Sequence, residues 1–413
     1  MTRPIAPPKR KNPLARTQRP LLPPSARSRT AHGLTLAAAE GRFALQRCED
    51  CQAFLYPPRD ACPHCLSHAL PFIDAPVGGT LVAGTTIRVT SDSYFRERMP
   101  WRQGIVAADC GPRIIASLHG ECLEGARVTL SLRLDKAGQA VAFATPVEET
   151  PDMHDDPQWR ELTADPKYRR ILITDGRNPV APALARALVQ AGAAHVFVGV
   201  AEGWKPLAGE AALRAVEGVE IVPLDLTDEQ SVADLAADIG AKVDILVNTA
   251  DHTRPVHVFD KGAARRLTET LDATLAGTMR LAHAFGPVML ARGADGTNAA
   301  VAWVNLLSIY ALAAQPAFGA LSVSHAACLS LSHWLRAELR AGGVRLMNVF
   351  SGPLDTEWYQ TAPPPKVAPG QLAEAVIDGL RRGLEEIYVG DVAKDVRERL
   401  AANPKALERE GSL

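Results

Sequence analysis

The sequence carries almost no net charge and few aromatic residues, and this limits the partners that its surface can favour. It holds 45 basic against 46 acidic residues, a formal charge of -1, and aromatic residues make up 5%. Binding to nucleic acid relies on clustered cations that meet phosphates and on aromatic rings that stack on bases. The composition therefore gives no support to nucleic acid or to an anionic membrane as the partner.

The chain also lacks a long apolar run. A membrane helix needs roughly 18 consecutive apolar residues, and no stretch approaches that length. Residues 1–31 are rich in proline, arginine and lysine, contain no acidic residue and lack the apolar core of a signal peptide. We expect a disordered basic tail there, with docking on an acidic partner as the alternative. We expect a cytoplasmic protein without membrane segments.

Four of the seven cysteines form two closely spaced pairs, Cys48 with Cys51 and Cys62 with Cys65. In a chain without an export signal this pattern indicates a metal site rather than disulfides. Two such turns that face each other can place four thiolates at the corners of a tetrahedron, as closed structural zinc sites do. We predict structural zinc, with iron in a rubredoxin-like site or four cysteines without metal as the alternatives.

Residues 77–147 contain five short segments rich in β-branched residues, separated by glycine, proline and charged turns. Apolar and polar residues alternate within them, which is typical of half-buried strands. We predict a small antiparallel β-barrel of the OB type. Before it, residues 32–76 predict a helix and the zinc ribbon. After it, the polar and proline-punctuated residues 148–168 predict a solvated linker, which is more plausible than a metal site at its acidic cluster.

The segment FALQRCEDCQAFLYPPRDACPHC and the strand GGTLVAGTTIRV resemble zinc-ribbon/OB-fold proteins of acyl-CoA metabolism. The resemblance covers about residues 32–145. It implies a protein without chemistry of its own that works as the obligate partner of a thiolase-like enzyme or of an acyl-CoA hydratase.

From residue 169 to residue 413 buried strands alternate with amphipathic helices. Strands that are apolar throughout are consistent with burial on both faces, so we predict an α/β doubly wound, Rossmann-like parallel sheet.

Within this second part, the stretch from Val304 to His325 resembles the active site of short-chain dehydrogenases/reductases. Ser308 stands where the family has its serine. Leu321 replaces the tyrosine acid/base, and His325 replaces the lysine. A leucine cannot donate or accept a proton, so the resemblance implies a dehydrogenase-like domain without its general acid. A rewired site that uses Ser308 and His325, with Tyr310 nearby, is the alternative.

The dinucleotide-binding motif of the same family is also altered. Its three glycines correspond here to Asp175, Pro179 and Ala181. Proline removes a backbone donor, and an aspartate places negative charge beside a phosphate. The degenerate remnants of a cofactor site are Thr174, Gly176, Asp225 and Asn248. On this interpretation we expect no NAD(P) binding, and we assign no residue to it.

Together these patterns predict a multidomain, non-catalytic accessory subunit of an acyl-CoA-processing complex. It would dock on a thiolase-like enzyme that cleaves a β-ketoacyl-CoA, similar to the small subunit of the benzylsuccinate β-oxidation thiolase, and help form the channel for the CoA substrate. The dehydrogenase-like domain would form a homo- or heterodimer through the two long helices that its family uses. The alternatives are an NAD(P)-dependent oxidoreductase acting on a hydroxyacyl-CoA or 3-oxoacyl-CoA, and a free-standing CoA-binding module.

Overall fold

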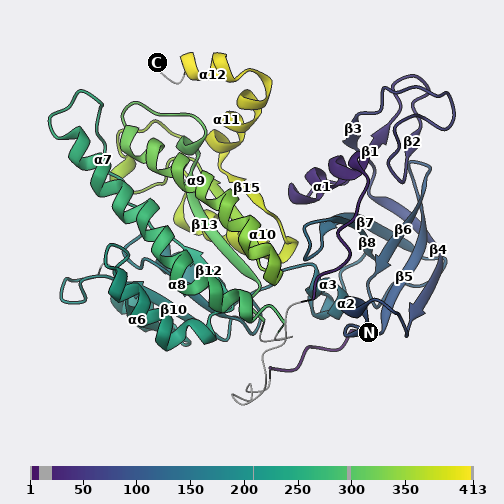
Figure 1. Cartoon of the computed structure of the whole chain (residues 1–413), viewed down its shortest axis with the longest axis horizontal. Coiled ribbons are helices and arrows are strands. Elements are labelled where there is room, and N and C mark those ends of the chain that lie inside the picture. The colour runs from purple at the N-terminus through teal and green to yellow at the C-terminus, as the bar shows by residue number, and fades with distance from the viewer. Residues whose placement is uncertain (1, 9–20, 208, 295–298, 411–413) are drawn as a thin grey trace. The chain divides into compact units, whose positions relative to one another are not determined.

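The computed structural model describes residues 2–8, 21–207, 209–294 and 299–410, and the chain divides into two compact units (Figure 1). The first unit has Leu21–Asp165 as its main stretch, and the second has Pro166–Arg381 and the chain from Glu385 onward. Among the helices of these described ranges, none is long and apolar enough to cross a membrane.

Part of the predicted N-terminal tail is bonded to the first unit. The backbone N–H of Thr2 donates to the Glu121 carboxylate, and that of Ile5 donates to Asp155. A short 3-10 helix, η1 (Arg29–Ala31), leads into the first α-helix. For residues 1 and 9–20, which lie outside the described ranges, the disordered tail stays a prediction.

The first unit begins with helix α1 (His32–Ala39), followed by a three-stranded sheet in the order β2-β1-β3. The strands are β1 (Ala44–Arg47), β2 (Phe54–Leu55) and β3 (Phe72–Asp74). Gly41 turns the chain between helix and sheet with a φ of +71°, a conformation that glycine adopts without strain. The helix and the short ribbon sheet lie where the sequence predicted them.

Five strands then close into a barrel in the order β4-β5-β6-β8-β7. Their bounds are β4 (Gly78–Ile87), β5 (Trp101–Ala108), β6 (Arg113–Leu118), β7 (Arg127–Leu134) and β8 (Ala140–Pro146), with the short helix α2 (Ser93–Arg96) between β4 and β5. All neighbouring strands run antiparallel except β6 and β8, which pair in parallel. The predicted antiparallel pairing holds for the other four pairs of neighbouring strands.

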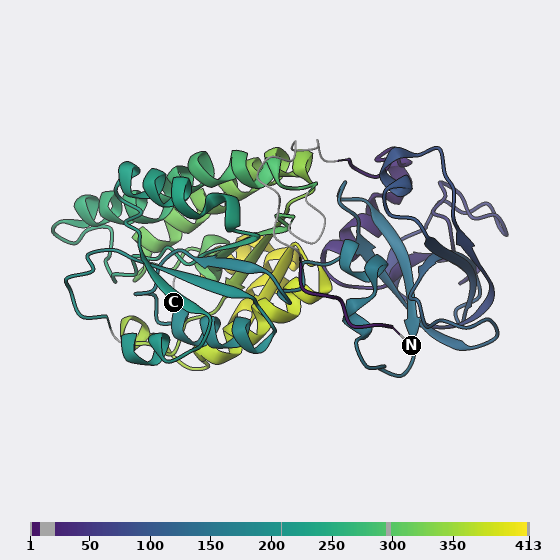
Figure 2. The ribbon, with the colours of Figure 1, turned by 90° about the horizontal axis from the view of Figure 1, so that it is seen from below.

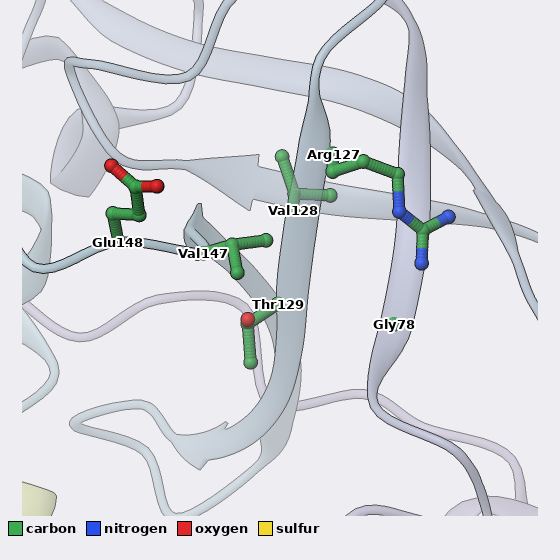
Figure 3. A pocket seen from close by; sticks show the side chains of 6 residues that line it. All are labelled: Gly78, Arg127, Val128, Thr129, Val147 and Glu148. Carbon is green, nitrogen blue, oxygen red and sulfur yellow. The ribbon is translucent and has the colours of Figure 1, made fainter.

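An ion pair joins the start of β7 to the residue that follows β5, beside the first residue of β4. Arg127 binds both carboxylate oxygens of Asp109, at 2.7 and 2.6 Å, across the strand position of Gly78. A Cβ atom at Gly78 would lie 2.2 Å from Asp109 Oδ2, so only glycine leaves room for this bridge. Beside it opens a pocket of about 530 Å³, lined by Gly78, Arg127, Val128, Thr129, Val147 and Glu148 (Figure 3).

The segment predicted as a solvated linker packs on the barrel instead. It forms η2 (Met153–Asp155) and helix α3 (Pro157–Glu161). The Gln158 side chain accepts from the backbone N–H of Arg102 at 2.6 Å and donates to its carbonyl at 3.0 Å, as a neighbouring strand would. Asp156 is 4% exposed because its carboxylate accepts from the N–H groups of Gly120 and Trp159. The acidic residues here satisfy backbone donors, and composition alone could not show this.

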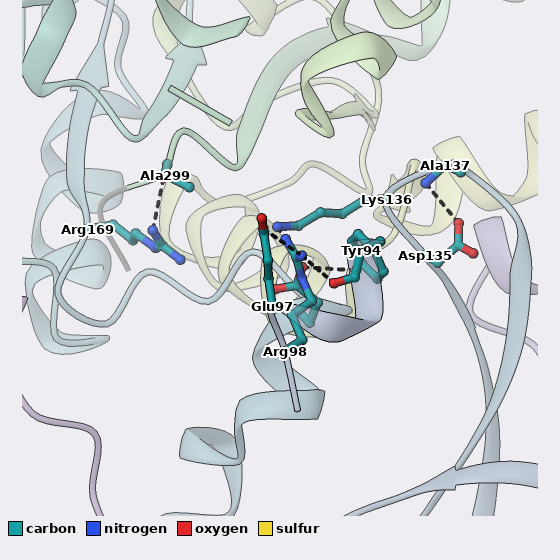
Figure 4. Close-up of polar contacts among 9 residues, drawn as sticks. Tyr94, Glu97, Arg98, Asp135, Lys136, Ala137, Arg169 and Ala299 are labelled. Atoms are coloured by element: carbon teal, nitrogen blue, oxygen red, sulfur yellow. Dashed lines mark hydrogen bonds and ion pairs between the residues drawn. The ribbon is translucent and has the colours of Figure 1, made fainter. Parts of the chain in front are cut away.

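A buried charge cluster fixes the end of α3. The Glu161 carboxylate accepts from the Tyr94 hydroxyl at 2.9 Å and pairs with Lys136 at 2.9 Å and with Arg98 at 2.5 Å. Figure 4 shows Tyr94, Arg98 and Lys136 converging. Burial alone would raise the pKa of Glu161, but the two cations lower it to about 2. The carboxylate therefore stays ionised in the folded protein.

The second unit is built on seven parallel strands in the order β11-β10-β9-β12-β13-β14-β15. Their bounds are β9 (Arg170–Ile173), β10 (His195–Val200), β11 (Val219–Pro223), β12 (Ile245–Asn248), β13 (Ala302–Ser308), β14 (Arg345–Ser351) and β15 (Glu386–Val389). The central strands are buried on both faces, as their uninterrupted apolar residues predicted. The predicted doubly wound sheet is confirmed.

Helices cover both faces of this sheet, and Figure 2 shows it between two helical layers. The helices are α4 (Ala181–Gln190), α5 (Glu210–Arg214), α6 (Glu229–Ile239), α7 (Ala263–Leu271), α8 (Gly277–Ala291), α9 (Gly319–Leu339), α10 (Pro369–Arg382), α11 (Asp391–Ala402) and α12 (Pro404–Glu410). A π-helical turn, η4 (Asp272–Ala276), joins α7 to α8. Leu235, Phe285 and Leu335 from α6, α8 and α9 pack with Trp303 in one core on the same face.

Candidate functional site

The four predicted zinc ligands meet at one point of the ribbon. The sulfur atoms of Cys48, Cys51, Cys62 and Cys65 all lie within 4.8 Å of one another. The distance is 3.4 Å from Cys48 to Cys65 and 3.6 Å from Cys51 to Cys62. Four sulfurs placed about 2.3 Å from a zinc ion in a regular tetrahedron would be about 3.8 Å apart. The cluster therefore fits a structural zinc ion held by four thiolates.

The two cysteine turns share the same backbone geometry. The residue after each second cysteine is left-handed, Gln52 with a φ of +63° and Leu66 with a φ of +65°. Its N–H donates at 2.9 Å to the carbonyl of the first cysteine of its pair. Hydrogen bonding by the Cys51 backbone lowers the pKa of the Cys48 thiol to about 6, whereas the pKa values of the Cys51 and Cys65 thiols are raised. Chain geometry thus prepares the site that the spacing predicted.

In the second unit, the positions of the family's catalytic residues lie at the carboxyl end of the parallel strands. Ser308 is the last residue of β13, and α9 carries Leu321 and His325. The Leu321 side chain is 1% exposed and belongs to the apolar interior. The structure thus brings Ser308 and His325 together, while the position between them in the motif carries no titratable group.

His325 is held by the backbone rather than by the serine hydroxyl. Its Nδ1 atom accepts a hydrogen bond from the Ser308 N–H at 2.8 Å, and the Ser308 hydroxyl accepts from the N–H of Tyr310 at 3.2 Å. Burial lowers the pKa of His325, so the imidazole is neutral with its proton on Nε2. A nucleophilic serine needs its own oxygen bonded to the base, and this pair does not offer that arrangement.

Two buried aromatic residues that the sequence analysis did not single out pack beside these positions. Phe318 stacks between Tyr310, with ring centroids 5.6 Å apart, and Tyr359, at 5.1 Å. Burial raises the pKa of Tyr359, and the nearby Asp251 carboxylate adds to this. No motif marks Phe318 or Tyr359, because they come together only through the paths of separate loops.

These loops are also joined above the sheet. The Arg254 guanidinium lies 3.7 Å from the centre of the Trp358 ring. The backbone N–H of Val256 donates to the carbonyl of Ala317 at 3.0 Å. The loops that follow β12, β13 and β14 are therefore bonded to one another at the carboxyl edge of the sheet.

The predicted remnants of a cofactor site each have a structural partner. The Thr174 hydroxyl donates to the Asn248 side chain at 3.1 Å, and that amide donates to Thr278 at 2.8 Å. Gly176 lies so close to β10 that a Cβ atom would sit 2.7 Å from the Val198 side chain. Asp225 accepts from the N–H and hydroxyl of Thr227 in the turn before α6. The structure brings Thr174 and Asn248 together and leaves Asp225 in a turn of its own.

Two separate parts of the chain match known protein families. Residues 37–71 match the family described as "ChsH2, rubredoxin-like zinc ribbon domain", and residues 177–379 match "Enoyl-(Acyl carrier protein) reductase". The short-chain dehydrogenase ptmH of Penicillium ochrochloron is 32% identical over 200 residues, which are 47% of this chain and 68% of that protein. The probable oxidoreductase EphD of Mycobacterium tuberculosis is 30% identical over 222 residues, 53% of this chain but 36% of EphD.

A solved structure supports the same placement. The crystal structure of a short chain dehydrogenase from Burkholderia cenocepacia, in complex with NADP, is 31% identical with a TM-score of 0.52. The match covers 59% of this chain and 97% of that one. The parallel sheet and these identities show that the chain belongs to the short-chain dehydrogenase family, with a zinc ribbon of the ChsH2 type ahead of the dehydrogenase domain.

Proposed function

We propose that this protein is a non-catalytic accessory subunit of an acyl-CoA-processing complex, and that it docks on a thiolase-like enzyme. The observation that carries the proposal is the burial and hydrogen bonding of the residues at the family's two catalytic positions. Leu321 is buried in the core, and the Nδ1 atom of His325 is occupied by the Ser308 N–H. Reduction of a carbonyl needs a group that delivers a proton to the oxygen, and neither residue is arranged to relay one.

The first unit supports the docking part of the proposal. A small Greek-key barrel in which the first strand pairs with the fourth, and the third runs parallel to the fifth, has the strand order of an OB fold. A closed site of four cysteines has no open position for substrate or water, so the metal would be structural. The chemistry of cleavage would then come from the partner, with the barrel helping to form the channel for its CoA substrate.

The dehydrogenase domain would supply a second contact, either with another copy or with an active homologue. Helices α8 and α9 expose apolar side chains, with Met279 43%, Val323 52% and Trp334 58% exposed. Exposed apolar side chains of this kind can be buried against another protein surface. Pairing through these helices would match the dimers that the family resemblance implies.

Co-purification of the tagged chain from its native host tests the docking. A thiolase-like protein should come with it, and the thiolase activity of the complex should fall when Cys48 and Cys51 are changed to serine. Cys110→Ser is the matched control, because Cys110 lies outside the metal cluster. A chain that purifies alone, or one that binds acyl-CoA without any partner, would refute this part of the proposal.

The second candidate is an NAD(P)-dependent oxidoreductase acting on a hydroxyacyl-CoA or 3-oxoacyl-CoA. Membership of the dehydrogenase family favours it, as does similarity to a protein solved with NADP. It requires nicotinamide binding and a pH-dependent hydride transfer, with Ser308 and His325 in rewired roles. NADPH fluorescence quenching together with turnover of a 3-oxoacyl-CoA would establish it over the accessory role.

A further inference from the structure

We infer that side chains of this chain itself occupy the loop between β9 and α4, which receives the pyrophosphate in dinucleotide-binding folds. The Asp175 carboxylate takes the place of a phosphate oxygen, and the Arg177 guanidinium fills the adenosine side. NADP, which the family implies, therefore does not fit this chain. The inference concerns the loop alone and does not depend on the proposed partner.

A dinucleotide is held in such folds by backbone N–H groups of this loop and of the helix start that follows it. Here those donors have partners inside the chain. The N–H of Gly176 donates to the Gly199 carbonyl at 2.7 Å, and the N–H of Arg177 donates to Asp175 Oδ1 at 2.8 Å. The N–H of Asn178 donates to the Asp175 carbonyl at 3.3 Å. The N–H groups of Val180 and Ala181 donate at 2.9 Å to Asn178, the first to its Oδ1 atom and the second to its carbonyl. Pro179 has no N–H to offer.

Asp175 also brings charge of the wrong sign. Burial raises the pKa of its carboxyl to about 6, and the Asp251 carboxylate adds to this, so Asp175 is ionised at neutral pH. The carboxylate accepts the Arg177 N–H, as a bound phosphate oxygen would. An incoming pyrophosphate would have to displace this internal anion and then lie beside it, at an electrostatic cost.

Arg177 closes the neighbouring side of the site. Its guanidinium and Nε make five hydrogen bonds of 3.0 to 3.2 Å to four backbone carbonyls after β10, those of Ala201, Glu202, Lys205 and Pro206. Glu202 is left-handed, with a φ of +49°, in the chain that bends around this group. In dinucleotide-binding folds the residue that holds the adenosine ribose follows this second strand. The loop is therefore wrapped around an arginine of the chain itself.

Two substitutions of Asp175 distinguish the effect of the occupied amides on binding from the effect of the negative charge. Asp175→Gly removes both the charge and the acceptor, whereas Asp175→Asn removes the charge but keeps an oxygen for the Arg177 N–H. Isothermal titration with inorganic pyrophosphate, and separately with NADP, should show no binding by the wild type or by Asp175→Asn. Asp175→Gly should bind pyrophosphate detectably, with a Kd at least about tenfold below the weakest Kd that the titration can measure, because the Arg177 N–H is freed.

Three results would overturn the inference. The first is tight NADP binding by the wild type. The second is an equal gain in Asp175→Asn and Asp175→Gly, which would leave charge as the sole cause. The third is a folded Asp175→Gly protein, with an unchanged circular dichroism spectrum, that gains nothing.

Hydrogen exchange gives a measurement on the wild type that does not depend on a variant folding. The amides of residues 176–181 should be protected without ligand, and pyrophosphate should leave that protection unchanged. Fast exchange that slows when NADP is added would show an open, cofactor-binding loop and would overturn the inference. Neither outcome bears on the co-purification of a thiolase-like partner, so the two proposals fail separately.

Discussion

The Nδ1 atom of His325 accepts the backbone N–H of Ser308 at 2.8 Å, where the dehydrogenase family resemblance implies a lysine. A lysine ammonium has no acceptor atom, so it could not take this bond. The histidine thus stabilises the junction between β13 and the loop before α9. A lysine at this position would leave the Ser308 N–H without this acceptor.

Restoring the family's residues with the double variant Leu321→Tyr/His325→Lys should therefore damage the fold without creating a reductase. Overpacking a fully buried leucine costs about 1–3 kcal/mol, and the Ser308 N–H would lose its acceptor. Urea denaturation measures the loss, with Leu321→Met as a control of nearly equal volume. NADPH oxidation with a 3-oxoacyl-CoA should stay at background, and measurable turnover would contradict the accessory role.

Asp175→Asn should stabilise the domain at neutral pH and have little effect in acid. The folded-state pKa of Asp175 is raised from 3.8 to about 6 by burial and by Asp251. Its stabilising contribution is therefore complete below pH 3.8 and is lost as the pH rises through 6. At pH 8 the asparagine variant should be more stable by about 3 kcal/mol. The same free energy difference at pH 4 and pH 8 would show that Asp175 titrates normally.

Glu161→Gln should destabilise the first unit by about 3 kcal/mol near pH 7, because it leaves Arg98 and Lys136 without their buried partner. The pKa of Glu161 is lowered to about 2, so its stabilising contribution is present above pH 4.5 and is lost as the pH falls toward 2. The exposed Glu149→Gln serves as the matched control. Acid unfolding curves for the two variants should differ at neutral pH and converge near pH 2.

Elemental analysis should find one zinc ion per chain, and Cys62→Ala should abolish it while Cys110→Ala leaves it in place. Because a closed cysteine site contributes directly to folding, removal of zinc by a strong chelator should expose the amides of β1 and β2 to rapid hydrogen exchange. A ribbon that keeps its protection after metal removal would show that the cysteines are not a structural metal site.

The sequence was informative wherever the deciding contacts are local or follow a fixed spacing. The pairs Cys48–Cys51 and Cys62–Cys65 each lie within one turn, so their spacing alone predicts the cluster. Ser308 and His325 could be located because a helix follows a strand at a fixed distance. Their hydrogen bond could not be predicted, since it depends on which nitrogen faces the strand end.

Other features depend on chain segments that are distant in sequence. Tyr359 and Tyr310, which are far apart in the sequence, each stack on Phe318. The carbonyl groups around Arg177 belong to a loop whose conformation no motif specifies. Polar composition led us to expect a solvated linker at residues 148–168, but in the structure the polar groups there bond to the barrel backbone.

The pairing of Gln158 with Arg102 determines where the N-terminal half can be divided from the rest. A fragment ending at Val147 would leave the N–H and carbonyl of Arg102 without the Gln158 side chain and would uncover Phe143, against which Trp159 packs. The shortest fragment able to fold independently should therefore extend to Asp165, because the polar segment covers part of the barrel.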